Sequence, residues 1–505
     1  MAVLAVDIGT STLKAAVADL ERGLLATYSE EVPVERPEPG AAEHNPRVLW
    51  EAFQRVVRGV LARAGEDLEV EALAFSGYLF GLIPLDRRGE PLSGVMTWLD
   101  RRPARIMPKL LGMVRPRELY ERTGCPPLSI YQLAKLLWMK MEKPELYDSA
   151  HLFLDAKGFV VLNLAGEAVM DLSSASGSQL VHSRRLHWDY ELLGSLGLDP
   201  SKLPPLKRST EIVGEVSRDI AEKLRLPRGT PIVAGVFDGA AVTVGEGALG
   251  GGIASSHLST STMLRVTSSE PIVDASDEMR FQTYYLFDGI WLPGGAVNSA
   301  GVVLRWFRDQ MGQLERIVGE AAGMSPYELL SREAERAPPG SEGLLFLPYI
   351  SGERFPSFGN QASGVLFGLK EHHTRAHVLR SMMEGVVLNL KIVGEALREN
   401  GLPFSEVRIT GGGARSRLWL QMIADILEVP VKAAVSGDAA LWGTSLIAWR
   451  SLGVISDIKR VAEERFEPEA VVYPDEGNAA VYRESYRRFR RLLDAAKQLF
   501  TELSA

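Results

Sequence analysis

Two turns rich in hydroxyl groups, far apart in the sequence, have the residue types of a phosphate-binding site. The first begins after an apolar segment with Asp7 and continues through Gly9, Thr10 and Ser11 to Lys14. Backbone N–H groups at such a glycine turn point outward and favour anions. We therefore expect these residues to bind the phosphates of a nucleotide.

The second turn, at residues 259–262, repeats the hydroxyl run as Ser-Thr-Ser-Thr at the start of an alternating apolar segment and includes Thr260. Two copies of one turn predict two similar domains that grip one polyphosphate. The simplest ligand for this arrangement is a nucleoside triphosphate with Mg²⁺. Hard cations prefer carboxylate and phosphate oxygens, so we expect Asp7 to be the metal ligand.

A single carboxylate, that of Asp238, follows a continuous apolar segment at residues 231–237. The segment predicts a buried strand that delivers the carboxylate into a glycine-flanked turn. A lone Asp after a strand is often a helix cap, which is the alternative interpretation. The helix of small residues expected at 240–247 leads into the second hydroxyl-rich turn, and this placement favours Asp238 as a general base.

Three consecutive glycines, Gly411, Gly412 and Gly413, follow an expected strand at residues 407–410. Their spacing does not match Gly-x-Gly-x-x-Gly, and the chain has no Gly-x4-Gly-Lys-Ser/Thr, so neither a dinucleotide fold nor a Walker site is indicated. Bare backbone lets a flat base lie against it, although the glycines could form only a tight turn. Gly301 opens a further helix whose N-terminus a ligand can approach closely.

A short apolar strand ends in Trp98, Asp100, Arg101 and Arg102. Guanidinium forks and carboxylates bind vicinal hydroxyls and acids well, so this group predicts a grip for a polyol or a sugar acid. The alternative is that Trp98 belongs to the core and that the charged residues begin a solvated helix.

The composition limits the class of protein. At 505 residues and 46% hydrophobic content the chain is long for one core, which favours two domains. The net charge of −8 and the lack of a basic stripe argue against nucleic-acid binding. Cys125 is the single cysteine, so no intramolecular disulfide forms. No apolar run approaches the roughly 18 residues of a membrane helix, and we expect a cytoplasmic protein with no membrane partner.

The elements expected to position these residues alternate between strands and helices, which indicates an α/β fold. Residues 5–34 predict three antiparallel strands, and a helix follows from a cap at Asn45 to about residue 60. A strand at 72–77 ends in small residues, as strands at ligand crevices do. The second half repeats this plan with insertions.

Taken in order, these motifs resemble the FGGY carbohydrate kinases of the actin-like ATPase superfamily. The resemblance covers essentially the whole chain, and it is carried by residues 7–10, 135–138, 238, 260–261, 295–301, 352–354 and 411–416. It implies two RNase-H-like domains, at residues 1–245 and 246–505, with ATP and a carbohydrate meeting in the cleft between them. A homodimer is left open.

The resemblance also implies roles for individual residues. Thr10 and Thr260 would contact the phosphates, Gly301, Gly412 and Gly413 would hold the nucleotide, and Asp238 would be the base. Tyr78 and Asp155 stand where the family holds its sugar.

Local motifs, among them Asp238-Gly239 and the segment 373–377, are most similar to the gluconokinase branch of the family. Gluconate is therefore the first expectation, with its carboxylate bound by Arg101 and Arg102 and its hydroxyls by Asp100. Ser259 and the run at 78–80 depart from the usual pattern, so xylulose, ribulose and glycerol-type polyols stay open. Proteins of other classes, an actin-like ATP sensor without catalysis or a regulatory polysaccharide-binding protein, remain alternatives.

Overall fold

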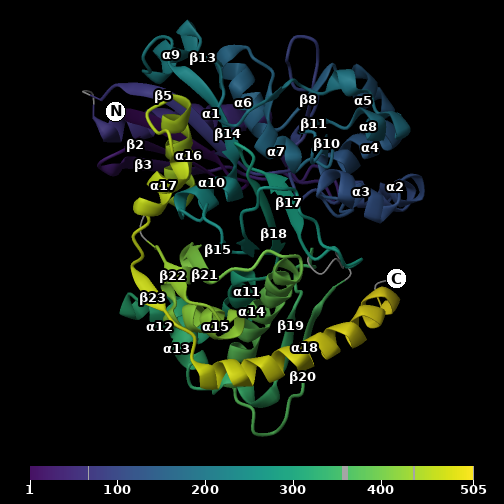
Figure 1. The fold of residues 1–505 in the computed structure, drawn as a ribbon, viewed down its shortest axis with the longest axis vertical. Coiled ribbons are helices and arrows are strands. Elements are labelled where there is room, and N and C mark those ends of the chain that lie inside the picture. Colours follow the sequence, from purple (N-terminus) through teal and green to yellow (C-terminus); the bar gives the residue numbers. More distant parts are fainter. Residues whose placement is uncertain (66–67, 355–361, 436–437, 504–505) are drawn as a thin grey trace.

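The computed structural model describes residues 1–505 except 66–67, 355–361, 436–437 and 504–505. It shows two halves, one above the other in Figure 1, and each half is built on a mixed β-sheet flanked by helices. Among the described residues, no helix is both long enough and apolar enough to cross a lipid bilayer.

The first sheet has six strands and is centred on β1, which is wholly buried. In spatial order the strands are β13 (Ile212–Glu215), β14 (Pro231–Phe237), β5 (Val70–Gly77), β1 (Ala2–Ile8), β2 (Thr12–Asp19) and β3 (Gly23–Glu31). The first three strands of the chain are antiparallel, as predicted, and β1 runs parallel to β5. The pairing places Asp7 directly opposite Lys14 across the first turn.

The second sheet repeats this order with one strand added. Its strands are β17 (Gln282–Tyr285), β18 (Trp291–Val297), β16 (Thr262–Arg265), β15 (Ile253–Leu258), β21 (Glu406–Thr410), β22 (Val431–Ala433) and β23 (Ala470–Val472). Here β15 is antiparallel to β16 and parallel to β21, just as β1 is to β2 and β5. The predicted repeat of one α/β plan is therefore confirmed.

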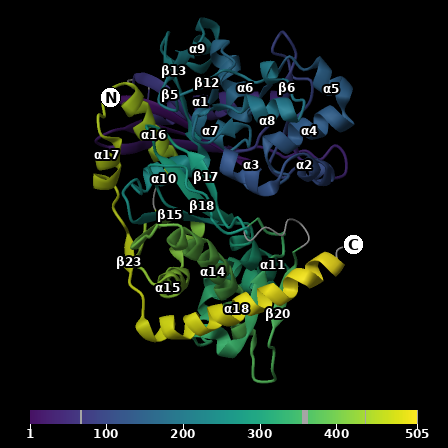
Figure 2. The same cartoon turned by 45° about the vertical axis from the view of Figure 1, so that its right-hand side comes forward.

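The helices of the first half cover its sheet and form a separate bundle beside it (Figures 1 and 2). They are α1 (Pro46–Ala64), α2 (Met107–Met113), α3 (Pro116–Thr123), α4 (Gln132–Glu142), α5 (Pro144–Ser149), α6 (Ala156–Ala165), α7 (Leu172–Ser176), α8 (Tyr190–Ser195) and α9 (Arg218–Leu224). Asn45 caps α1 by accepting hydrogen bonds from the N–H groups of Arg47 and Val48, as predicted. Short strands join these helices at β4 (Glu43–His44), β6 (Ile83–Leu85), β7 (Val95–Met96), β8 (Leu152–Leu154), β9 (Met170–Asp171), β10 (Val181–His182), β11 (His187–Trp188) and β12 (Leu206–Lys207).

The helices of the second half pack mainly around the long helix α14, and α18 runs along its outer side (Figure 1). They are α11 (Gly301–Met311), α12 (Gln313–Ala322), α13 (Pro326–Ala334), α14 (Arg375–Glu399), α15 (Arg417–Leu427), α17 (Ile458–Glu464) and α18 (Glu476–Leu503), with a hairpin of β19 (Leu345–Pro348) and β20 (Gly364–Phe367). Of these helices, α17 lies beside the first half (Figure 2).

Two helices connect the halves at the centre of the molecule. Helix α10 (Asp238–Gly245) leads from β14 towards β15, and α16 (Ala439–Ser451) returns from the second half to pack against β1 and β5. Their backbones touch, because a Cβ at Gly443 would lie 1.9 Å from the carbonyl oxygen of Ala241. Because glycine has no side chain, it allows α10 and α16 to pack against each other at this crossing between the two halves.

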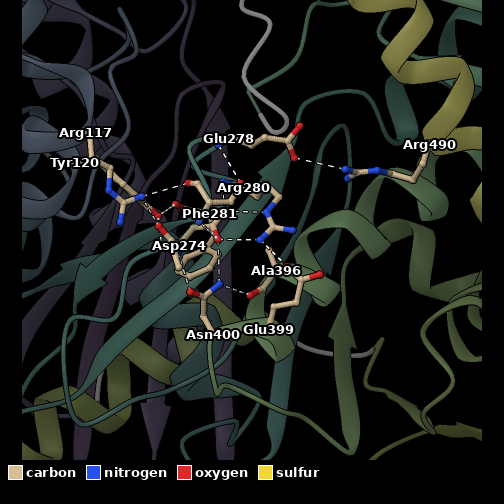
Figure 3. Close-up of polar contacts among 12 residues, drawn as sticks. Arg117, Tyr120, Asp274, Glu278, Arg280, Phe281, Ala396, Glu399, Asn400 and Arg490 are labelled. Carbon is tan, nitrogen blue, oxygen red and sulfur yellow. Dashed lines mark hydrogen bonds and ion pairs between the residues drawn. The ribbon is translucent and has the colours of Figure 1, made fainter.

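A polar network fastens the edge strand β17 to the first half (Figure 3). The Tyr120 hydroxyl on α3 donates to the carbonyl oxygen of Phe281 at 2.6 Å and accepts from the N–H of Asp274 at 2.8 Å. Asp274 also accepts from Arg280 and from Asn400 at the end of α14. The network therefore fixes the start of β17, whose next residues face the site described below.

Candidate functional site

A cavity of about 600 Å³ opens between the two halves, at the ends of both hydroxyl-rich turns. Seven residues predicted from the sequence line it, namely Asp7, Lys14, Tyr78, Trp98, Asp238, Gly411 and Gly412. The structure thus brings together the first turn, the Asp after β14 and the glycine run, although more than 400 residues separate the first of these from the last.

The first turn is rigid and anchored. Lys14 extends from β2 to the second half, where its Nζ lies 2.8 Å from Oδ2 of Asp438, the N-cap of α16. Thr10 is held by Trp98, whose Nε1 donates to the Thr10 hydroxyl at 3.0 Å. Gly9, Thr10 and Ser11 form the turn itself and are not among the described residues that line the cavity.

Three carboxylates come close to one another at the cavity floor. Asp7 is buried at the end of β1 and accepts a hydrogen bond from the Ser76 hydroxyl at 2.8 Å. Burial, together with the negative charges of Asp438 and Asp238, raises the pKa of Asp7 to about 7. This concentration of negative charge suits a cation or the proton of a reacting hydroxyl.

Asp238 is the first residue of α10, and its Oδ1 accepts from the N–H of Gly239 at 2.6 Å. The N-cap of α10 is Phe237, so Asp238 is not the predicted alternative cap. Burial raises the pKa of Asp238, and the nearby charge of Arg265 opposes that rise. A carboxylate with a raised pKa that faces a cavity has the properties of a general base.

A second cavity, of about 680 Å³, adjoins the first and shares Ser259, Gly412 and Arg415 with it. Thr260, Gly301, Gly412 and Gly413 line it, as do Leu304, Tyr327, Ser416 and Trp419. Gly411, at the shared wall, has φ +97° and lies so close to Leu258 that a Cβ would sit 2.6 Å from its carbonyl oxygen. Only glycine fits there, and the exposed backbone of the neighbouring glycines offers a flat surface.

Known proteins match this chain over nearly its full length. Residues 2–245 match the N-terminal domain of the FGGY family of carbohydrate kinases, and residues 254–452 match the C-terminal domain. The chain belongs to the FGGY carbohydrate kinases. Like its family, it is an ATP-dependent carbohydrate kinase. The division of the chain at residues 245 and 246 stays a prediction.

The relatives of this kinase fall under two names, gluconokinase and xylulose kinase. The gluconokinase of Bacillus subtilis is 32% identical over 463 residues, covering 91% of this chain and 90% of its own length. The xylulose kinase of the same organism is 27% identical over 506 residues, covering 100% and 99%. Crystal structures of a gluconate kinase and a xylulose kinase from Lactobacillus acidophilus both superpose with a TM-score of 0.92, at 25% and 26% identity, and cover at least 99% of each chain.

The predicted anchor for an acid is wrong in this kinase. Asp100 is buried outside the cavity, and its carboxylate accepts from Arg102 and from the N–H of Ala42 at 3.1 Å. Arg102 is surrounded by acids, because its Nη1 also pairs with Glu38 at 2.7 Å. Arg101 is exposed and lies outside the described lining of the cavity.

Asp155 is not among the described residues that line the cavity, although its charge helps to raise the pKa of the lining residue Tyr78. It caps α6 by accepting a hydrogen bond from the N–H of Gly158 at 2.6 Å. Burial raises its pKa to about 6. The carboxylate of Asp155 is thus used within the first half to begin a helix, and a contact with the substrate stays a prediction.

Several residues that line the central cavity of the kinase were not predicted from the sequence. Arg265 ends β16, Gln282 begins β17, and Arg354 follows the hairpin strand β19. The Nε of Arg354 donates to Oδ1 of Asn298 at 2.5 Å, and its guanidinium lies 5.5 Å from the Trp98 ring. Arg265 could have been found from its place at the end of the strand after the second turn.

Lys135 on α4 holds two walls of the cavity in place. It is fully buried, and its Nζ donates to the carbonyl oxygens of Phe80 and Thr97, the latter at 2.8 Å. These carbonyls belong to the two loops that carry Tyr78 and Trp98. We therefore expect Lys135, the first residue of the motif at 135–138, to position these two loops.

Replacing Lys135 with Met should raise KM for the carbohydrate more than it lowers kcat. Methionine fills the space but leaves the two carbonyls without donors, at a cost of about 1–3 kcal/mol each, and the loops that carry Tyr78 and Trp98 should shift. Steady-state kinetics and thermal unfolding measure both effects. Lys140→Met, on the same helix but away from these loops, is the matched control. An unchanged KM in the Lys135 variant would show that the tether does not position the site.

Proposed function

We propose that this kinase transfers the γ-phosphoryl group of ATP to the terminal hydroxyl of gluconate or a related sugar acid. The observation that carries the proposal is the central cavity, where a half-buried carboxylate, Asp238, lies beside residues of both phosphate-type turns. The gluconokinase relatives support the acid. Xylulose is the second candidate, because relatives and solved structures named xylulose kinase match the chain equally well in fold.

In this proposal each cavity has one task. The carbohydrate occupies the side lined by Tyr78, Trp98 and Asp238, and the triphosphate lies along the turns of Gly9 to Lys14 and of Thr260. The adenosine occupies the second cavity, against Gly412, Gly413 and the start of α11 at Gly301, while Gly411 lies on the side of the first cavity. Asp238 takes the proton of the attacking hydroxyl, whose oxygen bonds to the γ-phosphorus as the bond to ADP breaks.

The residues present fit Mg²⁺. Burial and the negative charges of Asp438 and Asp238 raise the pKa of Asp7, and neither the hydrogen bond from Ser76 nor the charge of Lys14 fully offsets that rise. A divalent cation held by Asp7, with Asp438 nearby, would remove the repulsion. When bound, Mg²⁺ supplies charge neutralisation for the phosphates. A supply of ATP and Mg²⁺ is also consistent with the cytoplasmic location that we propose.

The test is ATP turnover with gluconate, xylulose, ribulose and glycerol, each compared with ATP alone. We expect gluconate to stimulate turnover and to give the highest kcat/KM. A ketopentose preferred by tenfold or more would instead favour xylulose kinase activity. If no carbohydrate stimulated turnover, an ATP sensor would be the better description.

A further inference from the structure

Arg265 is a buried cation on the wall of the central cavity. It is 7% exposed, and its guanidinium lies 5.4 Å from the Phe237 ring. Its Nη1 donates to the Sδ of Met263 and its Nε has no hydrogen-bond partner, and no ion pair of Arg265 with an acid forms among the residues that the structure describes. A buried guanidinium without a carboxylate is costly, so an anionic ligand is the expected partner.

Two glycines make room for this side chain. A Cβ at Gly239 would lie 2.2 Å from Nη1 of Arg265, and a Cβ at Gly294 would lie 2.6 Å from its Cγ. Because Gly239 directly follows Asp238, the guanidinium rests against the backbone beside the proposed base. Its charge acts on Asp238 without forming an ion pair, so the base stays free to receive a proton.

A second guanidinium and two unpaired polar atoms lie on this side of the cavity. Arg354 is close enough for its positive charge to act on Arg265. The Thr262 hydroxyl and Oε1 of Gln282 are buried without hydrogen bonds among the described residues. Two guanidiniums together with an unpaired hydroxyl and an unpaired amide oxygen match a ligand with one carboxylate and several hydroxyl groups.

We propose that Arg265, assisted by Arg354, binds the carboxylate of the sugar-acid substrate, and that Gly239 is required to give Arg265 its place. This inference rests on the proposed function and names the residues that select the acid. A neutral polyol offers neither guanidinium an anionic partner, whereas a carboxylate can pair with both. The kinase should therefore select its substrate by the carboxylate group and not by the length or the hydroxyl pattern of the carbohydrate.

The test compares gluconate with glucitol, which differs in having a CH₂OH group in place of the carboxylate. Arg265→Gln should lower kcat/KM for gluconate by about 10- to 100-fold and should change kcat/KM for glucitol by less than about threefold. Gly239→Ala, which displaces the guanidinium, should lower the same preference. Arg101→Gln, an exposed arginine outside the cavity, is the matched control and should leave both substrates unchanged.

An equal loss with both substrates would overturn the proposal, since Arg265 would then act on the transferred phosphoryl group. An unchanged preference for gluconate would overturn it as well, while leaving the proposed function intact. Failure of the proposed function is seen separately, as wild-type protein without turnover of any sugar acid. If no sugar acid is turned over, calorimetric titration with gluconate still tests the binding role of Arg265. Weaker binding of gluconate to the Arg265→Gln variant than to the wild type supports that role, and equal binding contradicts it.

Discussion

Replacing Asp238 with Asn should lower kcat by at least about a hundredfold while ATP binds as in the wild type. Asn keeps the shape of the side chain and can still accept the hydrogen bond from the N–H of Gly239. It cannot accept the proton of the carbohydrate hydroxyl. The loss should therefore appear in kcat, measured by ADP release, and not in the affinity for ATP, measured by calorimetric titration.

The pH dependence gives an independent check on Asp238. Burial raises its pKa, and a base works only when deprotonated, so kcat/KM of the wild type should fall as the pH drops through that raised pKa. Asp155→Asn is the matched control, because Asp155 is also a buried carboxylate but begins α6 outside the cavity. That variant should lose stability rather than kcat. Full activity in the Asp238 variant would reduce Asp238 to the first residue of a helix.

The fold and the proposed phosphate-binding elements could be predicted because their signals are local. The turn after Asp7 is a short run of residues between two strands, and the pairing of Asp7 with Lys14 follows from it. The strand at 231–237, which ends just before Asp238, was also predictable from a short local run of apolar residues. Repetition of the turn near Thr260 indicated a second sheet of the same order, which the structure confirms.

The carbohydrate side was predicted less well, because the partners of a charged residue depend on distant segments. Arg102 looked available in the sequence, but the fold brings Glu38 to it and occupies its guanidinium. Arg265 ends a strand after the second turn, and the space at Gly239 and Gly294 allows its guanidinium to lie in the cavity without an ion pair among the described residues. Short-range sequence patterns cannot show which arginine forms an ion pair within the folded protein and which stays available to a ligand.

Replacing Asp7 with Asn should abolish turnover and, in the absence of ligands, make the protein more stable at pH 8. The pKa of Asp7 is raised in the folded protein from 3.8 to about 7. The folded state therefore holds the proton more tightly than the unfolded state, and the free energy of unfolding falls as the pH rises from about 4 to about 7. Above pH 7 the cost of the ionised group is on the order of 4 kcal/mol, and Asn removes it.

Most of the stability gain should disappear at pH 4, because the pH is then close to the unfolded-state pKa of 3.8 and the folded protein keeps Asp7 protonated. The pH dependence of the difference in Tm between variant and wild type is therefore an internal control. Mg²⁺ with ADP should raise the Tm of the wild type at pH 8, because a cation offsets the repulsion from Asp438 and Asp238, and should do so much less in the variant. Gluconate binding should stay close to wild type.

A Tm difference that does not change with pH, or turnover that keeps its full Mg²⁺ dependence without the carboxylate, would contradict the assignment of Asp7 as the metal ligand. If the expected pattern is found, Asp7 is a residue that the folded protein keeps at a cost in stability, because the carboxylate is needed only when the metal and the nucleotide are bound.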